Sequence, residues 1–374
     1  MMKIAYMSQS FIPSRSANSI HVMKMCQVLA EEGHQVTLFA PDAKNDMESG
    51  VADIYSFYDV SHCFHIVYLP WLWIKGRGYL YGYLAAQKAR QLKPDIIYGR
   101  SIVACYFATF DDVPIMLESH APETKKIPVW MFERLIQCPT FHQLIVITEA
   151  LCDHYLTKYP CLEGKIQVVP DGADPVSSKT IPVSLPNAKS RLQIGYVGHL
   201  YQGKGMEIIS RIASKCPWAD FHVIGGMDKD IAYWKHQCKG DGNIFFHGFL
   251  PHSEVRRFIL SFDVVLAPYQ RHITVYGDSG DIGKWTSPLK LFEYMAAGKA
   301  IVCSDLPVLK EVLCHKKTAL LVDPESPEAW EQALGQLRDD IFLRERLGLE
   351  AQEIFNTRYT WQARARQILS KIQD

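Results

Sequence analysis

The chain has 374 residues, more than the ~250–300 at which a single hydrophobic core usually divides, so two domains are expected. Apolar residues make up 48% and charged residues 21% of the chain, as in ordinary globular proteins and unlike disordered ones. Lys plus Arg and Asp plus Glu both number 40, and this balance gives no support to nucleic-acid binding.

Short apolar segments alternate with amphipathic ones in the first half of the chain. Strands are expected at 3–8, 34–42, 95–101, 114–120 and 144–150, and helices at 19–33 and 82–94. Continuously apolar strands separated by helical patterns are typical of a parallel sheet that helices cover on both faces. Residues 170–190 carry four prolines and show no periodicity, which indicates a linker.

Beyond the linker the same alternation resumes, and it closes with an amphipathic helical pattern in WQARARQILSKIQ. We therefore predict an α/β protein with two Rossmann-like, doubly wound domains facing a central cleft. The first domain is expected over 1–183 and the second over 191–350, with a C-terminal helix at 351–374 packing back on the first. Ligands of open α/β sheets bind at the carboxyl ends of the strands, which here would line the cleft.

The remaining bulk features concern the cellular compartment. The ten cysteines are scattered without zinc-ligand spacing, which predicts reduced thiols in a cytoplasmic protein. The opening MMKIAYMSQSF lacks the apolar segment of a signal peptide and is expected to form a strand. No run approaches the ~18 uninterrupted apolar residues of a membrane-spanning helix.

The segment GYVGHLYQGKGMEII (195–209) has the pattern of a strand, a glycine-containing loop and a helix. Small residues let backbone amides approach an anion, and the start of the helix adds the positive end of its dipole. Lys204 and His199 would add side-chain donors for a diphosphate. The alternative is an ordinary turn with a solvent-facing lysine, and the spacing alone does not decide between the two.

A second turn of this kind begins at Ser287 with SPLKLFEYM. Pro288 suits the start of a helix, where its missing N–H costs nothing. The amides around Ser287, Leu289 and Lys290 can then meet a negatively charged group. One turn further, Glu293 could accept two hydrogen bonds from the diol of a ribose. Its alternative role is to stabilise the helix dipole.

Taken in order, these motifs resemble the retaining glycosyltransferases of the GT-B fold, in the large family four. The resemblance extends over nearly the whole chain and includes EEGHQVTLFAP, VITEALCDHYL and VVPDGAD. In the second half it includes GYVGHLYQGKG, FHGFLPHSEVRRFILSFDVVLAPY, SPLKLFEYMAAGKAIVCSDLPVLKEVL and the closing RYTW. It implies a hexosyltransferase that moves a sugar from a nucleotide-sugar donor to a carbohydrate or lipid-linked glycan acceptor. Retention of configuration, no metal or cofactor, and a place in cell-surface polysaccharide or glycoconjugate synthesis are implied with it.

The resemblance also implies three catalytic positions. Lys204 matches the basic residue that neutralises the departing diphosphate, and His199 stands where an arginine is common, so its charge depends on pH. His120, which ends PIMLESH, matches a histidine that faces the donor sugar; its alternative is a structural role at a strand end. Front-face displacement through an oxocarbenium-like state is expected, with catalysis resting mainly on stabilising the charge of the leaving phosphate.

Donor binding follows from the same resemblance. Glu293 matches the second glutamate of a pair and would hold the nucleotide ribose, whereas Trp285 replaces the first. Asp278 or Asp281 would be the acid that substitutes for it. The first loop has SRSANS where many relatives carry a glycine pair, so close backbone approach must come through its small residues. The other expected donor contacts are Ser287, Pro288, Leu289, Lys290, Gly248, Ala17 and Asn18.

The acceptor is expected on the first domain, where YLPWLWIKGRGYLYGY (68–83) gathers aromatic and basic residues. Such a patch suits an anionic lipid surface or a polyprenyl-phosphate-linked acceptor, so peripheral contact with the inner face of the membrane is expected. Trp73, Arg77 and Arg100 are the predicted acceptor contacts. The alternative is that the tryptophan rings, Trp71 included, belong to the core of the domain.

Two other classes of protein are open alternatives, and a third lacks its motif. A nucleotide-sugar epimerase of the same fold and a non-catalytic two-domain binding protein remain alternatives, although a binder of small solutes seldom needs a diphosphate cradle. A dehydrogenase would require GxGxxG in the first strand-to-helix turn, which MSQSFIPSRSANS does not supply. The nucleotide base, the sugar, the acceptor and its linkage, and the oligomeric state are not encoded in any recognisable pattern.

Overall fold

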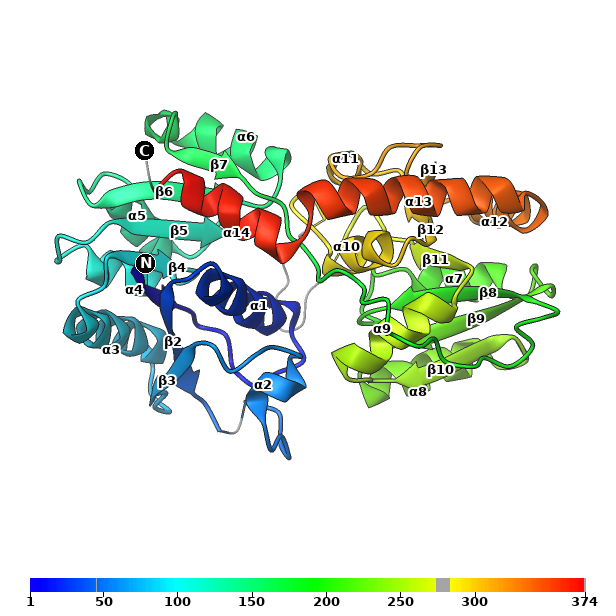
Figure 1. The fold of residues 1–374 in the computed structure, drawn as a ribbon, viewed down its shortest axis with the longest axis horizontal. Coiled ribbons are helices and arrows are strands. Elements are labelled where there is room, and N and C mark those ends of the chain that lie inside the picture. Colours follow the sequence, from blue (N-terminus) through cyan, green and yellow to red (C-terminus); the bar gives the residue numbers. More distant parts are fainter. Residues whose placement is uncertain (45, 274–282, 373–374) are drawn as a thin grey trace. The chain divides into compact units, whose positions relative to one another are not determined.

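A computed structural model of the chain describes residues 1–44, 46–273 and 283–372 and contains two compact units (Figure 1). The first unit comprises Met1–Pro170 together with the segment that begins at Trp361, and the second comprises Asp171–Thr360. The chain therefore passes from the first unit to the second after residue 170 and returns to the first unit after residue 360. The sequence suggests boundaries at 183 and 351. The expected linker belongs to the second unit because it packs there: the amide of Val183 donates to the carbonyl of Arg257 at 3.4 Å.

The first unit is a seven-stranded parallel sheet in the order β3-β2-β1-β4-β5-β6-β7. The strand order reverses direction between β1 and β4, the position at which open sheets leave a crevice for ligands. Its strands are β1 Lys3–Met7, β2 Gln35–Asp42, β3 His65–Pro70, β4 Ile96–Gly99, β5 Ile115–Ser119, β6 Phe141–Val146 and β7 Ile166–Val168. Its helices are α1 Ala17–Glu31, α2 Ile54–Phe57, α3 Arg77–Leu92, α4 Ile102–Ala108, α5 Lys126–Leu135, α6 Glu149–Lys158 and α14 Trp361–Ser370, with a 3₁₀ turn at Pro160–Leu162.

The second unit is a six-stranded parallel sheet in the order β10-β9-β8-β11-β12-β13, which reverses between β8 and β11. Its strands are β8 Leu192–Val197, β9 Ala219–Ile224, β10 Ile244–Gly248, β11 Val264–Ala267, β12 Ala300–Ser304 and β13 Leu320–Val322. Its helices are α7 Met206–Ile212, α8 Asp228–Gln237, α9 His252–Ser261, α10 Leu289–Ala296, α11 Pro307–Lys310, α12 Pro327–Asp339 and α13 Ile341–Arg358. Both halves thus have the predicted doubly wound α/β architecture.

The C-terminal region divides between the two units. Helix α13 closes the second unit by running over the turn before β12, and a Cβ on its Gly348 would lie 2.1 Å from the carbonyl oxygen of Gly298. Only glycine permits that approach of helix to turn. After Thr360 the chain enters the first unit as α14, which packs against α1 (Figure 1, red and blue). The helix predicted as one element at 351–374 is therefore two helices in two units.

Candidate functional site

The loop that joins β8 to α7 is tightly folded. Gly203 and Gly205 have φ values of +83° and +121°, and any Cβ there would collide with the chain that follows β11. The carboxylate of Glu207 accepts hydrogen bonds from both of their amides, at 3.0 and 3.2 Å. These two amides are therefore already used by the protein's own anion. Fewer backbone amides than expected are therefore available to bind a phosphate at this loop. The positive charge of the loop comes from Lys204.

The side chain of Lys204 lies next to the aromatic ring of Tyr269. The hydroxyl of Tyr196 lies 2.7 Å from the carbonyl oxygen of His199 and 3.1 Å from that of Lys204, which fixes the loop to β8. The Lys204 ammonium is 5.5 Å from the centroid of the Tyr269 ring, and burial lowers its pKa to about 8. The His199 ring stacks on the ring of Tyr201, with the two ring centroids 4.8 Å apart.

A second lysine reaches the same ring from α10. The Nζ atom of Lys290 is 3.9 Å from the Tyr196 centroid and 5.0 Å from the Tyr269 centroid. This atom is buried and has no hydrogen-bond partner among the described residues. Burial, and next the charge of Lys204, hold the pKa of Lys290 well below its usual range. The amino groups of Lys204 and Lys290 thus both lie near the Tyr269 ring, and no described carboxylate forms an ion pair with either. A bound anion would compensate this buried positive charge.

Glu293 lies one turn further along α10 and is half-buried. Its Oε1 atom is 3.7 Å from Nδ1 of His252, at the start of α9. The structure thus carries Lys204, Lys290 and Glu293 on neighbouring elements of one unit, and Glu293 acts electrostatically on Lys290. The two turns singled out from the sequence therefore meet.

The remaining donor positions of this unit surround those turns. Ser287 accepts a 3.4 Å hydrogen bond from the amide of Asp171, and Pro288 is the extended residue that precedes α10. Leu289 is half-buried at the first position of that helix. Gly248, with φ +71°, ends β10 and accepts a 2.7 Å hydrogen bond from the amide of Gly225. Trp285 is described, whereas Asp278 and Asp281 lie outside the described residues.

The sequence places Ala17 and Asn18 in the loop before the first helix, and this placement is wrong, whereas their contact with the donor stays a prediction. They are instead the first residues of α1, and Asn18 is not among the positive-φ residues. The reason is the cap: the Ser16 hydroxyl accepts a 3.2 Å hydrogen bond from the amide of Ser19, so the helix starts directly after Ser16.

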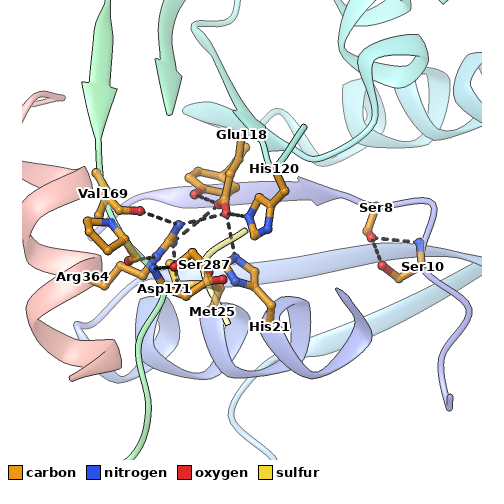
Figure 2. Close-up of polar contacts among 12 residues, drawn as sticks. Ser8, Ser10, His21, Met25, Glu118, His120, Val169, Asp171, Ser287 and Arg364 are labelled. Atoms are coloured by element: carbon orange, nitrogen blue, oxygen red, sulfur yellow. Dashed lines mark hydrogen bonds and ion pairs between the residues drawn. The ribbon is translucent and has the colours of Figure 1, made fainter. Parts of the chain in front are cut away.

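In the first unit, His120 belongs to a buried charged cluster around Glu118 (Figure 2). The hydroxyl of Tyr98 donates to Glu118 Oε2, and His120 Nε2 donates to Oε1. Arg364 Nη2 and His21 Nε2 each lie 2.9 Å from the same Oε1. Burial acts to raise the pKa of Glu118, but Arg364 and the two histidines outweigh it and hold that pKa well below its usual range.

The histidines and the glutamate of this cluster also have the spacing of metal ligands. Their ligand atoms lie within 4.8 Å of one another. However, the Arg364 guanidinium donates to the same carboxylate oxygen that a metal would need. A fixed cation at that oxygen opposes a second one, so the donor set suits a hydrogen-bonded cluster better than a metal centre.

The predicted acceptor residues separate into two kinds of environment. The guanidinium of Arg77 lies 5.0 Å from the Trp71 ring centroid and 5.2 Å from that of Trp73. Trp71 packs against Phe11, whereas Trp73 is 71% exposed. Trp71 is half-buried and Trp73 is exposed, so neither ring belongs to the buried core of the unit. Arg100 directly follows β4, and its buried Nη1 has no hydrogen-bond partner within the described part of the chain.

Comparison with known proteins agrees with this architecture. A model for "Glycosyltransferase Family 4" matches residues 19–176, and one for "Glycosyl transferases group 1" matches residues 191–340. Among solved structures, sucrose-phosphate synthase from Thermosynechococcus elongatus has a TM-score of 0.75 at 16% identity, covering 100% of this chain and 98% of its own. The Anabaena HepE protein in complex with UDP has a TM-score of 0.72 at 15% identity, with both chains covered completely. Each half of the chain thus matches a glycosyltransferase model, and the chain belongs to the GT-B glycosyltransferases of the family-four type.

Two relatives show how far the sequence similarity extends. The phosphatidyl-myo-inositol mannosyltransferase of Mycolicibacterium smegmatis is 24% identical, over 68% of this chain and 64% of that protein. The D-inositol 3-phosphate glycosyltransferase of Corynebacterium glutamicum is 36% identical, over 62% of this chain and 57% of that protein. The chain therefore spans less than two thirds of the length of these relatives. Within the described residues, none of the helices combines the length and the apolar character that a bilayer span requires.

The sequence reasoning missed several members of these sites, and three of them show why. Glu118 lies inside the apolar strand IMLES, where a carboxylate signals a buried charge that needs partners. Arg364 supplies the main one, but no local pattern connects a residue of α14 with β5. Glu207 follows Gly205 by two residues in the first helical turn, a position from which a carboxylate regularly caps free amides.

Proposed function

We propose that the protein is a retaining glycosyltransferase that takes a sugar from a nucleoside-diphosphate donor. The observation that carries this proposal is the pair Lys204 and Lys290 at the Tyr269 ring, two amino groups with which no carboxylate of the described residues forms an ion pair. A diphosphate would supply the missing negative charge, and Glu293 lies one turn away for the ribose. The complexes of the Anabaena HepE protein with UDP and with UDP and glucose support a donor of this class.

The same lysines would serve the chemistry of sugar transfer. Departure of the nucleoside diphosphate builds negative charge on its oxygens, and fixed ammonium groups in a poorly hydrated site stabilise that charge. No metal ion or cofactor is needed for this role. His120 would face the donor sugar, and the family resemblance favours transfer from the leaving-group side with retention.

The acceptor is proposed to be a glycan or a polyprenyl-linked sugar with an anionic group. The guanidinium of Arg77 lies near the rings of Trp71 and Trp73, and none of the ion pairs among described residues includes it. An exposed ring such as Trp73 can pack on a sugar face or enter the headgroup region of a membrane. Synthesis of a cell-surface polysaccharide or glycoconjugate, with the protein in the cytoplasm at the inner membrane face, is consistent with this chemistry.

Binding tests the donor site first. Titration calorimetry with UDP, GDP, ADP and inorganic phosphate should show micromolar binding of at least one nucleotide. Lys204→Met should weaken it by about 10- to 100-fold, since each lost charge-assisted hydrogen bond costs about 1.5–3 kcal/mol. Lys215→Met is the matched control, because Lys215 pairs with Glu328 on the surface at 3.2 Å. Equal binding by both variants would contradict the proposed site.

Product analysis then tests the reaction. The cognate nucleotide sugar should be consumed only when a glycan acceptor is present, and proton NMR of the new linkage should show the anomeric configuration of the donor. Conversion of the nucleotide sugar without acceptor would favour an epimerase. Binding without turnover across an acceptor panel would favour a non-catalytic protein.

A further inference from the structure

We infer that Glu118 is a positioning residue for His120, and that α14 takes part in this function through Arg364. The inference rests on the proposed function in that His120 is taken to face the donor sugar. It concerns how the imidazole is oriented, and it is independent of which sugar is transferred.

The hydrogen bond between the two residues fixes the tautomer of the ring. An ionised carboxylate can only accept, so the His120 nitrogen next to Glu118 must carry a proton. That nitrogen is Nε2. In a neutral imidazole the other nitrogen, Nδ1, then carries no proton and is a hydrogen-bond acceptor.

Glu118 is itself held in one orientation by three residues besides His120. Tyr98 on β4 donates to one carboxylate oxygen, while His21 on α1 and Arg364 on α14 approach the other. Arg364 is tied down in turn, because its Nε donates to the carbonyl of Pro170 at 3.0 Å. The carboxylate therefore stays charged and cannot rotate away from His120.

Exposure separates His120 from the rest of the cluster. The side chains of Glu118, His21 and Arg364 are at most 1% exposed, whereas that of His120 is 22% exposed. A purely structural network gains nothing from bringing one ring to the surface. Figure 2 shows the ring at the edge of the cluster, beyond the carboxylate that holds it. A buried charged network with a single accessible imidazole is the arrangement by which enzymes orient a histidine.

The experiment compares Glu118→Gln, Glu118→Asp and wild type by steady-state kinetics. Glu118→Gln should lower kcat by roughly 10- to 100-fold while the donor KM changes less than about threefold, because donor binding lies in the other unit. Glu118→Asp retains the charge and should recover part of kcat. Arg364→Lys should also lower kcat, whereas Arg366→Lys is the control, since Arg366 on the same helix pairs with Glu32 at the exposed surface.

A second measurement reads the tautomer directly. Long-range ¹H–¹⁵N correlation spectra, at a pH where the ring is neutral, should show His120 with its proton on Nε2; His120→Asn assigns the signal. Glu118→Gln should mix the two tautomers. An Nδ1–H ring in the wild type, or unchanged kcat and tautomer in Glu118→Gln, would overturn the inference.

The two readouts keep this inference apart from the proposed function. If the wild-type protein transfers no sugar, the proposed function fails, while the spectra still decide whether Glu118 orients His120. If Glu118→Gln does not fold, the wild-type tautomer alone decides, with Nε2–H supporting the inference and Nδ1–H overturning it.

Discussion

The ring of Tyr269 is approached by two lysines that repel one another and lack a described counter-ion. Burying an unpaired ammonium group opposes folding, because the group loses its hydration without gaining a partner. Sites of this kind persist where a ligand supplies the missing charge, so function and stability are in conflict at Lys290.

The first prediction follows from that conflict. Lys290→Met replaces the ammonium with an apolar side chain of similar length, which should raise the free energy of unfolding by about 1–3 kcal/mol. The same change should weaken nucleotide binding by about 10-fold or more, since a cation next to the diphosphate is lost. Urea unfolding and calorimetry measure the two effects. A variant that is both less stable and equally able to bind would refute this role.

The second prediction concerns protons. The pKa of Lys204 is about 8 without ligand, and a bound diphosphate should raise it because an opposite charge favours the ammonium form. Binding above pH 8 should therefore take up a proton, and affinity should fall as pH rises through 8. Calorimetry in two buffers of different ionisation enthalpy counts this proton. Lys204→Met should decrease the number of protons taken up on binding. An unchanged number would show that another group takes up the proton.

Elements pack closely where glycine allows it, and α13 over Gly298 is the clearest case. Helix α13 contains a glycine at such a close contact, Gly348, whereas helix α12 contains a glycine with open space around it, Gly335. Gly348 faces a backbone carbonyl at contact distance, whereas a Cβ on Gly335 would meet nothing within 4 Å. The same substitution should therefore have opposite effects in neighbouring helices.

The third prediction uses that pair. Gly335→Ala should stabilise the protein by about 0.4–1 kcal/mol, because alanine restricts the unfolded chain and suits a helix. Gly348→Ala should destabilise it by about 1–3 kcal/mol, because α13 must move away from the turn before β12. Chemical denaturation monitored by tryptophan fluorescence gives both values. If both substitutions changed the stability in the same direction, α13 would be able to shift away from the turn at Gly298 at little cost.

Local patterns predicted most elements and explain those that were missed. Strands β1, β5 and β6 are mostly apolar and almost fully buried because helices cover both faces of the sheet. Strand β3 was missed because it lies at the sheet edge, where its residues are only half-buried and the apolar signal is weak. The two lysine-bearing turns were recognisable because each is a local strand-to-helix motif. The partners of Glu118 were not, since they come from three other elements.

At the scale of the whole molecule, the two units differ in how the chain builds them. The second unit is one continuous segment, whereas the first needs α14 from the far end of the chain. Without α14, Glu118 would lose its guanidinium partner while its histidine neighbours remain. Removing one partner of a buried ion pair typically costs about 3–5 kcal/mol.

The fourth prediction separates the units. A fragment of residues 171–360 should fold cooperatively and bind the same nucleotide as the whole chain, because Lys204, Lys290 and Glu293 all lie within it. A fragment of residues 1–170 should be poorly folded until a peptide of residues 361–374 is added. Circular dichroism and hydrogen exchange report both outcomes. A stable 1–170 fragment would show that α14 is dispensable for the first unit.

The separation of Glu118 from Arg364 by 246 positions has a consequence for biosynthesis. A nascent chain carries the buried carboxylate long before the ribosome reaches its guanidinium partner. The second unit can therefore fold first, although it is translated second. Proteolysis or premature termination near residue 360 should accordingly leave a product that still captures nucleotide but has lost the environment that holds His120.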